Sequence, residues 1–99
     1  MKTGVIIGTI VATRKDDSMV GHKLLATQQV DLNMKPIGQV LIAVDAVGAG
    51  VGDYVLFSTG SAARNSVQKP KSSIDAAIVG IIDGKDIHFD VLDEIGGDK

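Results

Sequence analysis

The abundance of stiff β-branched residues, interrupted at short intervals by glycine, constrains the fold of this chain most strongly. Its 99 residues include 12 valines, 11 isoleucines and 12 glycines. Valine and isoleucine lose side-chain freedom in a helix but pack well on a pleated sheet, and glycine favours turns. A chain of this length holds one hydrophobic core. The sequence therefore predicts a single all-β domain over residues 1–99.

Apolar stretches separated by charged turns or by turns containing proline or glycine predict six short strands. The dipeptide Asp83-Gly84, typical of hairpins, precedes the last of them. A single helical turn is expected over residues 60–65, with Ser61 as its N-cap. Together these elements predict a small, partly closed OB-like β-barrel with one short helical turn. The predicted strands are Gly4–Thr13, His22–Asp31, Gln39–Val44, Tyr54–Phe57, Ala76–Ile82 and Ile87–Leu92.

The first and fifth predicted strands are apolar on both faces. The first strand places Val5, Ile7, Thr9 and Val11 on one face, and its other face is equally apolar. Burial of one such β-branched side chain stabilises a protein by roughly 1.5–3 kcal/mol, but a small barrel lacks the interior to bury both faces. We therefore expect the outer faces to lie against another subunit.

Composition disfavours several classes of function. The chain carries 10 basic and 12 acidic residues, and a net charge of −2 disfavours binding to nucleic-acid phosphates. The absence of cysteine excludes disulfides, thiolate zinc sites and a cysteine nucleophile. No apolar run approaches the roughly 20 residues that cross a bilayer, and the first residues lack a signal-peptide cleavage site. We therefore expect a cytoplasmic protein with neither nucleic-acid nor membrane partners.

Groups that could support catalysis or bind a metal are scattered along the chain. The glycine-rich segment 48–52 runs into a strand and lacks the Gly-Lys-Ser/Thr of a phosphate-binding loop. His22 and His88 are 66 positions apart, and the aspartates are spread over several strand ends. Metal and acid–base sites need converging groups. The sequence therefore predicts no enzyme activity, no metal and no cofactor.

Several segments form a specific combination in a fixed order. The glycine-rich segment is weakly specific alone, but a Ser-Ala-Ala-Arg turn and an Asp-Ala-Ala-Ile-Val-Gly-Ile-Ile-Asp strand follow it. The segments are Gly8–Lys15, Lys23–Leu25, Ala43–Asp53, Gly60–Arg64 and Asp75–Asp83. In this combination the chain, over about residues 4–83, resembles the bacterial microcompartment vertex family, the EutN/CcmL-type pentameric shell proteins. Arg14, where relatives often carry a polar residue, is a small departure from the family pattern.

The resemblance implies an OB-like barrel, a closed ring of five copies and a structural role at the five-fold vertices of a carboxysome or metabolosome shell. Its partners would be itself and hexameric or pseudohexameric shell proteins. It also implies a subunit interface that includes Val5, Ile7, Thr9, Val11, Gly48, Ala49, Gly50 and Gly52. The implied contact with neighbouring shell tiles lies at Gly60, Ser61, Ala62, Ala63 and Arg64.

Some alternatives stay open at the level of sequence. Arg64 offers donors that suit a partner's carbonyl or carboxylate groups, yet it is equally compatible with a local surface arginine. An OB-type module that binds single-stranded nucleic acid is a second reading, although it calls for stacking aromatic residues, and the chain has three aromatics in all. A small enzyme is a third. The tail over residues 86–99 either extends the barrel or reaches a neighbour.

Overall fold

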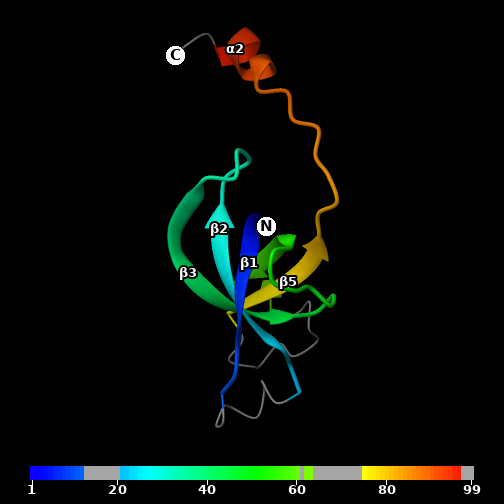
Figure 1. The fold of residues 1–99 in the computed structure, drawn as a ribbon. Coiled ribbons are helices and arrows are strands. Elements are labelled where there is room, and N and C mark those ends of the chain that lie inside the picture. Colours follow the sequence, from blue (N-terminus) through cyan, green and yellow to red (C-terminus); the bar gives the residue numbers. More distant parts are fainter. Residues whose placement is uncertain (13–20, 61, 64–74, 97–99) are drawn as a thin grey trace.

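The computed structural model describes residues 1–12, 21–60, 62–63 and 75–96. Five strands form a closed barrel, and a short helix stands apart from it (Figure 1). No helix in the described ranges is long and apolar enough to cross a membrane. The elements are β1 (Lys2–Ile10), β2 (Leu24–Val30), β3 (Pro36–Asp45), β4 (Tyr54–Thr59), β5 (Ala76–Ile81) and α2 (Asp90–Gly96).

The barrel closes in the strand order β1-β2-β3-β5-β4, with β4 pairing back onto β1. All pairs are antiparallel except β3 with β5, where Val44 lies opposite Ala77. This closed barrel of short strands confirms the OB-like architecture expected from the sequence. β3 begins three residues earlier than expected, because Pro36 pairs with Val30 directly after the β2–β3 turn.

The barrel interior is filled by alternate residues of every strand. Phe57 of β4 is fully buried at the centre, in contact with a cluster drawn from all five strands. Gly4 admits no side chain there, since a Cβ atom would lie 2.9 Å from the carbonyl oxygen of Gln28 and 3.1 Å from the Phe57 ring. The members of this central cluster are Ile6, Leu25, Ala43, Ala49, Val55, Phe57, Ala76 and Ile78.

The expected sixth strand over Ile87–Leu92 and its Asp83-Gly84 hairpin are wrong. Residues 82–89 form an extended segment without strand pairing, and α2 follows. The closed barrel explains the error, since β5 already pairs with β4 on one side and β3 on the other. Helix formation is favoured instead by Asp90 and Asp93, whose charges complement the dipole at the start of α2.

The expected helical turn after β4 is only partly visible. Ala62 and Ala63 are helical, and Gly60 before them has a φ of 64°, which favours glycine. Ser61, predicted as the N-cap, lies outside the described residues, as do Arg64 and Asn65.

Candidate subunit interface

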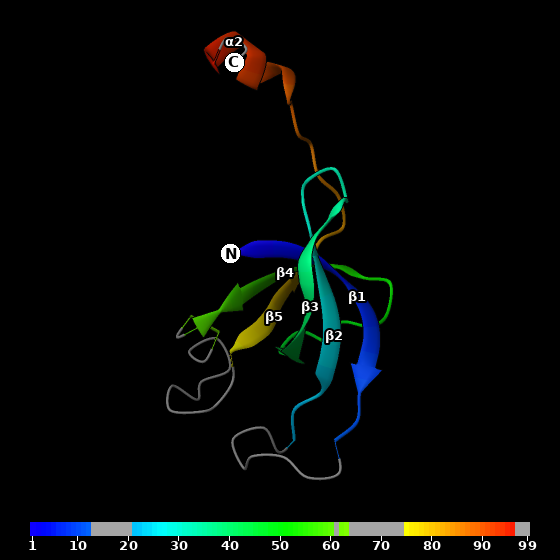
Figure 2. The same ribbon diagram turned by 90° about the vertical axis from the view of Figure 1, so that its left-hand side faces the viewer.

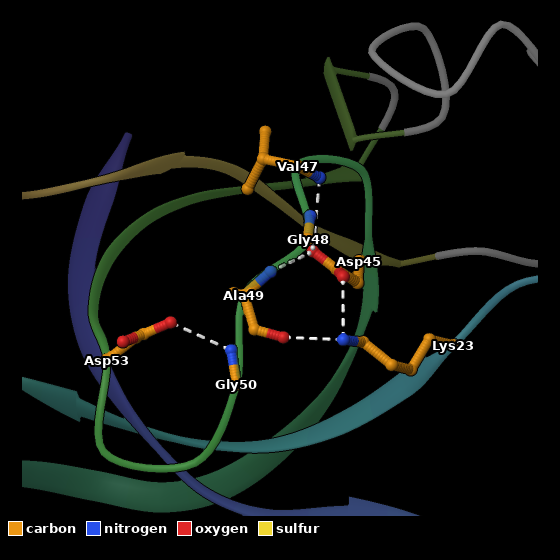
Figure 3. A network of polar contacts seen from close by, with 7 residues as sticks. All are labelled: Lys23, Asp45, Val47, Gly48, Ala49, Gly50 and Asp53. Atoms are coloured by element: carbon orange, nitrogen blue, oxygen red, sulfur yellow. Dashed lines mark hydrogen bonds and ion pairs between the residues drawn. The ribbon is translucent and has the colours of Figure 1, made fainter.

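The segment between β3 and β4, residues 46–53, is held by the side chain of Asp45 at the end of β3. We call this segment the glycine loop. The Oδ1 atom of Asp45 accepts hydrogen bonds from the backbone N–H groups of Val47 (3.1 Å), Gly48 (3.0 Å) and Ala49 (3.1 Å) (Figure 3). A single carboxylate oxygen therefore shapes the first half of the loop.

Lys23, just before β2, ties the same carboxylate to the loop. Its Nζ atom lies 3.2 Å from Oδ2 of Asp45 and donates to the carbonyl oxygen of Ala49 at 2.6 Å (Figure 3). The Asp45 side chain is only 5% exposed, whereas that of Lys23 is 45% exposed. The ammonium group thus compensates a buried carboxylate while keeping part of its own hydration.

The environment of Asp45 changes its acidity in two opposing ways. Burial raises the pKa of this carboxyl, but the N–H groups of Ala49 and Val47 and the ammonium of Lys23 lower it more. The net result is a pKa below the ordinary value for aspartate. Asp45 is therefore an anion that the fold stabilises as an anion.

The second half of the glycine loop is bonded to β1. Asp53 accepts a hydrogen bond from the N–H of Gly50 through Oδ2 at 2.8 Å (Figure 3). The N–H of Gly52 donates to the carbonyl of Ile6 at 2.8 Å, and the N–H of Ile6 donates to the carbonyl of Asp53 at 3.0 Å. Within one subunit, the structure thus brings together the two regions that the family resemblance assigned to one subunit interface, the glycine loop and the first strand.

The backbone conformation requires glycine at some positions of this loop and not at others. Gly48 and Gly52 have φ angles of 82° and 93°, in the region that side-chain-bearing residues rarely adopt. Gly50 has no such angle, and a Cβ atom placed there would meet nothing within 4 Å. One described subunit therefore gives no reason for glycine at position 50.

The predicted interface residues in and after β1 are exposed or partly exposed, but they do not share one face. A register shift between Ile6 and Gly8 breaks the expected alternation, so Thr9 lies opposite Leu25 of the core, and Val11 lies beyond the end of β1. Ile7 is 53% exposed and Val11 is 88% exposed, while Thr9 is exposed and Val5 is partly exposed. Ala49 behaves differently, since its side chain is fully buried in the core of its own barrel. That methyl group is unavailable to another subunit, so any contact at this position would involve the neighbouring glycines.

The predicted shell-tile turn is also divided. Gly60 and Ala62 are exposed, whereas Ala63 is fully buried and packs with Leu24, Val44 and Ala77. Ser61 and Arg64 lie outside the described residues.

Sequence reasoning missed two features of this region. On the outer face of β3, the side chain of Val40 is 47% exposed and that of Ile42 is 52% exposed. Ile42 lies opposite Ala26 of β2, and Ala26 lies opposite Gly8 of β1. The signal for this outer face was the Val-Leu-Ile-Ala-Val run, which is as apolar on both faces as the first strand. Lys23 was the second omission, because a lysine that precedes a strand does not reveal which distant carboxylate it meets. We call the exposed apolar side chains of Ile7, Val11, Val40 and Ile42, in and beside β1 and β3, the outer wall.

The distribution of aromatic residues bears on the nucleic-acid alternative. Phe57 is fully buried, Tyr54 is partly buried, and Phe89 lies outside the barrel just before α2. The faces of β2 and β3, which bind oligonucleotides in OB-folds, carry no aromatic side chain in this chain. Stacking of bases is therefore not supported there.

A closed five-stranded barrel with an apolar outer wall and a glycine loop bonded to its first strand defines a small β-barrel protein suited to self-association. The chain belongs to the EutN/CcmL family. The family model described as "Ethanolamine utilisation protein EutN/carboxysome" matches residues 1–83, which confirms the resemblance drawn from the sequence.

Two relatives show how far the similarity extends. The chain is 47% identical over 83 residues to the bacterial microcompartment shell vertex protein GrpN of Rhodospirillum rubrum, covering 84% of this chain and 93% of the relative. It is 46% identical over 83 residues to the carboxysome shell vertex protein CcmL of Gloeobacter violaceus, covering 84% and 83%.

Solved structures agree with this assignment. The GrpN pentameric microcompartment shell protein from Rhodospirillum rubrum superposes with a TM-score of 0.80 at 42% identity, covering 89% of this chain and all of the other. The structure of Gloeobacter violaceus CcmL gives 0.80 at 44% identity, covering 88% of this chain and 90% of that chain. The barrel is therefore shared with these shell proteins.

Proposed function

We propose that this chain forms a closed homopentamer that caps the five-fold vertices of a bacterial microcompartment shell. The role is structural and involves no catalysis. The observation that carries the proposal is the identity of 46–47% over 83 residues to relatives named as shell vertex proteins. A pentamer among hexagonal tiles introduces the curvature that closes a flat layer.

The outer wall supports self-association on physical grounds. Exposed Ile7, Val11 and Ile42 gain free energy when another protein surface removes them from water. A closed ring arises when one patch of each subunit meets a different patch of the next. We place the outer face of β1 and the glycines of the glycine loop in that contact.

The wider setting is part of the same proposal. The ring sits in a shell in the cytoplasm, with hexameric and pseudohexameric shell proteins as its neighbours and the turn over residues 60–64 as the contact with them. Residues 1–99 act as one vertex domain.

The mass of the purified protein in solution tests the ring. Native mass spectrometry should give about five times 10.3 kDa. A protein that is monomeric across the accessible concentration range would overturn the proposal.

The variant Gly50→Val tests the place of the glycine loop in the ring. Position 50 has open surroundings and no positive φ, so the variant subunit should fold with an unchanged circular dichroism spectrum. The ring should nevertheless be lost, because the added side chain blocks the close approach of a neighbour. Asn33→Val is the control, since Asn33 is exposed in the β2–β3 turn and lies outside the proposed subunit contacts. An intact pentamer from Gly50→Val would remove the loop from the interface.

The variant Arg64→Ala tests the contact with shell tiles. The ring should stay pentameric, while closed particles formed with a co-expressed hexameric shell protein should become fewer in electron micrographs. Lys2→Ala removes an exposed cation elsewhere and serves as the control. Normal particle closure by Arg64→Ala would rule out this contact.

A further inference from the structure

Residues 82–96 form an arm that leaves the barrel at the end of β5 and ends in α2. We call it the C-terminal arm. In both views α2 lies well clear of the barrel, beyond the β2–β3 turn (Figures 1 and 2). From residue 83 to residue 96 every residue is exposed, and α2 has no buried residue. The family match ends at residue 83, so all but the first two residues of the arm lie beyond the part described by the family model.

One side of the arm's helical end is apolar. Phe89, Leu92 and Ile95 are spaced three residues apart, which places them along one side of a helical segment. They are 42%, 64% and 78% exposed. A helix of only seven residues has little stability of its own in water, so its order depends on packing of that side against another surface.

Lys85 fixes the direction in which the arm leaves its own barrel. Its ammonium donates to the carbonyl of Leu32 in the β2–β3 turn and lies 5.3 Å from the centre of the Tyr54 ring. These contacts hold the start of the arm beside the rim of the barrel, and the rest of the arm continues outward (Figure 1). The apolar side of α2 thus receives no cover from its own subunit.

The charges of the two parts of the chain are complementary. Residues 1–82 contain eight lysines and arginines and six acidic residues, a net charge of +2. Residues 83–99 contain two lysines and six acidic residues, a net charge of −4. Five of the eight basic residues lie outside the described residues, so the complementarity is one of net charge along the chain. An acidic segment with an apolar side suits a partner of opposite net charge with exposed apolar residues, and residues 1–82 of a second copy have both.

We propose that the C-terminal arm of each subunit docks on the barrel of the next subunit in the ring, with Phe89, Leu92 and Ile95 against that barrel. This inference rests on the proposed pentamer, which supplies each arm with a neighbouring barrel. The arm then acts as a clasp between adjacent subunits, in addition to the contact made by β1 and the glycine loop.

Cross-linking from α2 tests which chain the arm touches. The sequence has no cysteine, so Leu92→Cys introduces a unique thiol for a maleimide–benzophenone label. Irradiation of the labelled pentamer should give covalent dimers and higher species, with linked peptides from the barrel of another subunit. Linkage only within one chain, or no linkage at all, would overturn the proposal.

A second measurement examines the contribution of the apolar side. The double variant Leu92→Asp/Ile95→Asp should raise the concentration at which the ring half dissociates by about tenfold or more, since burial of one aliphatic side chain contributes more than the 1.4 kcal/mol of a tenfold change. Met34→Asp is the matched control, because Met34 is an exposed apolar residue of the β2–β3 turn whose φ of 67° suits aspartate. Equal dissociation of the wild type and the double variant would contradict the clasp.

The two proposals fail in different ways. A wild-type monomer in native mass spectrometry overturns the pentamer itself. A wild-type pentamer whose arm gives no link to another chain leaves the pentamer standing and overturns the clasp alone.

Discussion

The glycine loop and the first part of the C-terminal arm are both eight-residue segments outside regular structure, residues 46–53 and 82–89. In the loop, the carboxylates of Asp45 and Asp53 accept four backbone N–H groups, and further backbone bonds join the loop to β1. The arm rests on the N–H of Ile82 bonded to Tyr54 and on the contacts of Lys85. The loop therefore takes its shape from within the subunit, whereas cover for the end of the arm has to come from elsewhere.

Removal of the Asp45 carboxylate, which shapes the glycine loop, should cause the largest loss of unfolding free energy. Asp45→Ala deprives three N–H groups of their acceptor and leaves Lys23 without its counter-ion. Because Val47 and Gly48 are exposed, water replaces part of the loss, and we expect a destabilisation of about 2–4 kcal/mol. Urea unfolding measured by circular dichroism gives this number. Asp45→Asn, which keeps an acceptor oxygen, should cost about half as much, and equal losses would contradict the role of the acceptor.

The next largest effect should be a difference in unfolding free energy between substitutions at two glycines of the loop. Gly52→Ala forces a side chain into a backbone conformation with φ of 93°, at a cost of about 1–2 kcal/mol. Gly50→Ala should change the free energy of unfolding by less than about 0.5 kcal/mol, because its surroundings are open. The same urea experiment compares the two variants under dissociating conditions, and a reversed order would refute the conformational explanation.

Acid should weaken the hydrogen bonds that shape the glycine loop. The pKa of Asp45 is lower in the folded than in the unfolded chain, so its contribution to stability is complete above the unfolded pKa and is lost as the pH falls through the folded one. Unfolding free energy should therefore decline below about pH 4. Asp31 also has a lowered pKa, through the N–H of Lys35 above all, and adds a slope of the same sign. The part of the slope due to Asp45 is the part that Asp45→Asn abolishes.

Removal of the arm should have the smallest effect on a single subunit. A chain ending at Asp83 loses no buried residue, so the free energy of unfolding of the isolated barrel should change by less than about 0.5 kcal/mol. Thermal unfolding at low protein concentration measures it. A loss of several kcal/mol would mean that the arm belongs to the barrel core.

The sequence was sufficient for the barrel because its strands carry strong local signals. β-branched residues flanked by glycine and aspartate placed all five strands to within a few residues. The same alternation misled over Ile87, Phe89 and Val91, where period two suggested a strand. Strand formation there depends on a free edge beside β5, and barrel closure is a property of the whole chain that no local pattern reveals.

The candidate site was predictable in part for the same reason. The exposure of Ile7 was expected from alternation along the first strand, and the glycine loop was visible as a motif. The register shift between Ile6 and Gly8, which breaks that alternation before Thr9, was not visible. Burial of Ala49 and Ala63 was not, because a methyl group fits a core or a surface equally well. The bond of Lys23 to the loop joins residues 26 positions apart, and such a meeting depends on the register of β2 against β3.

The open surroundings of Gly50 have a consequence for any survey of substitutions in this protein. Folding of one chain places no steric demand on position 50, so a screen that scores only the folded fraction will rank it as permissive. A screen that scores finished particles applies a different filter. Positions at which the two rankings disagree would be those where selection acts on assembly of the particle and not on folding of the single chain.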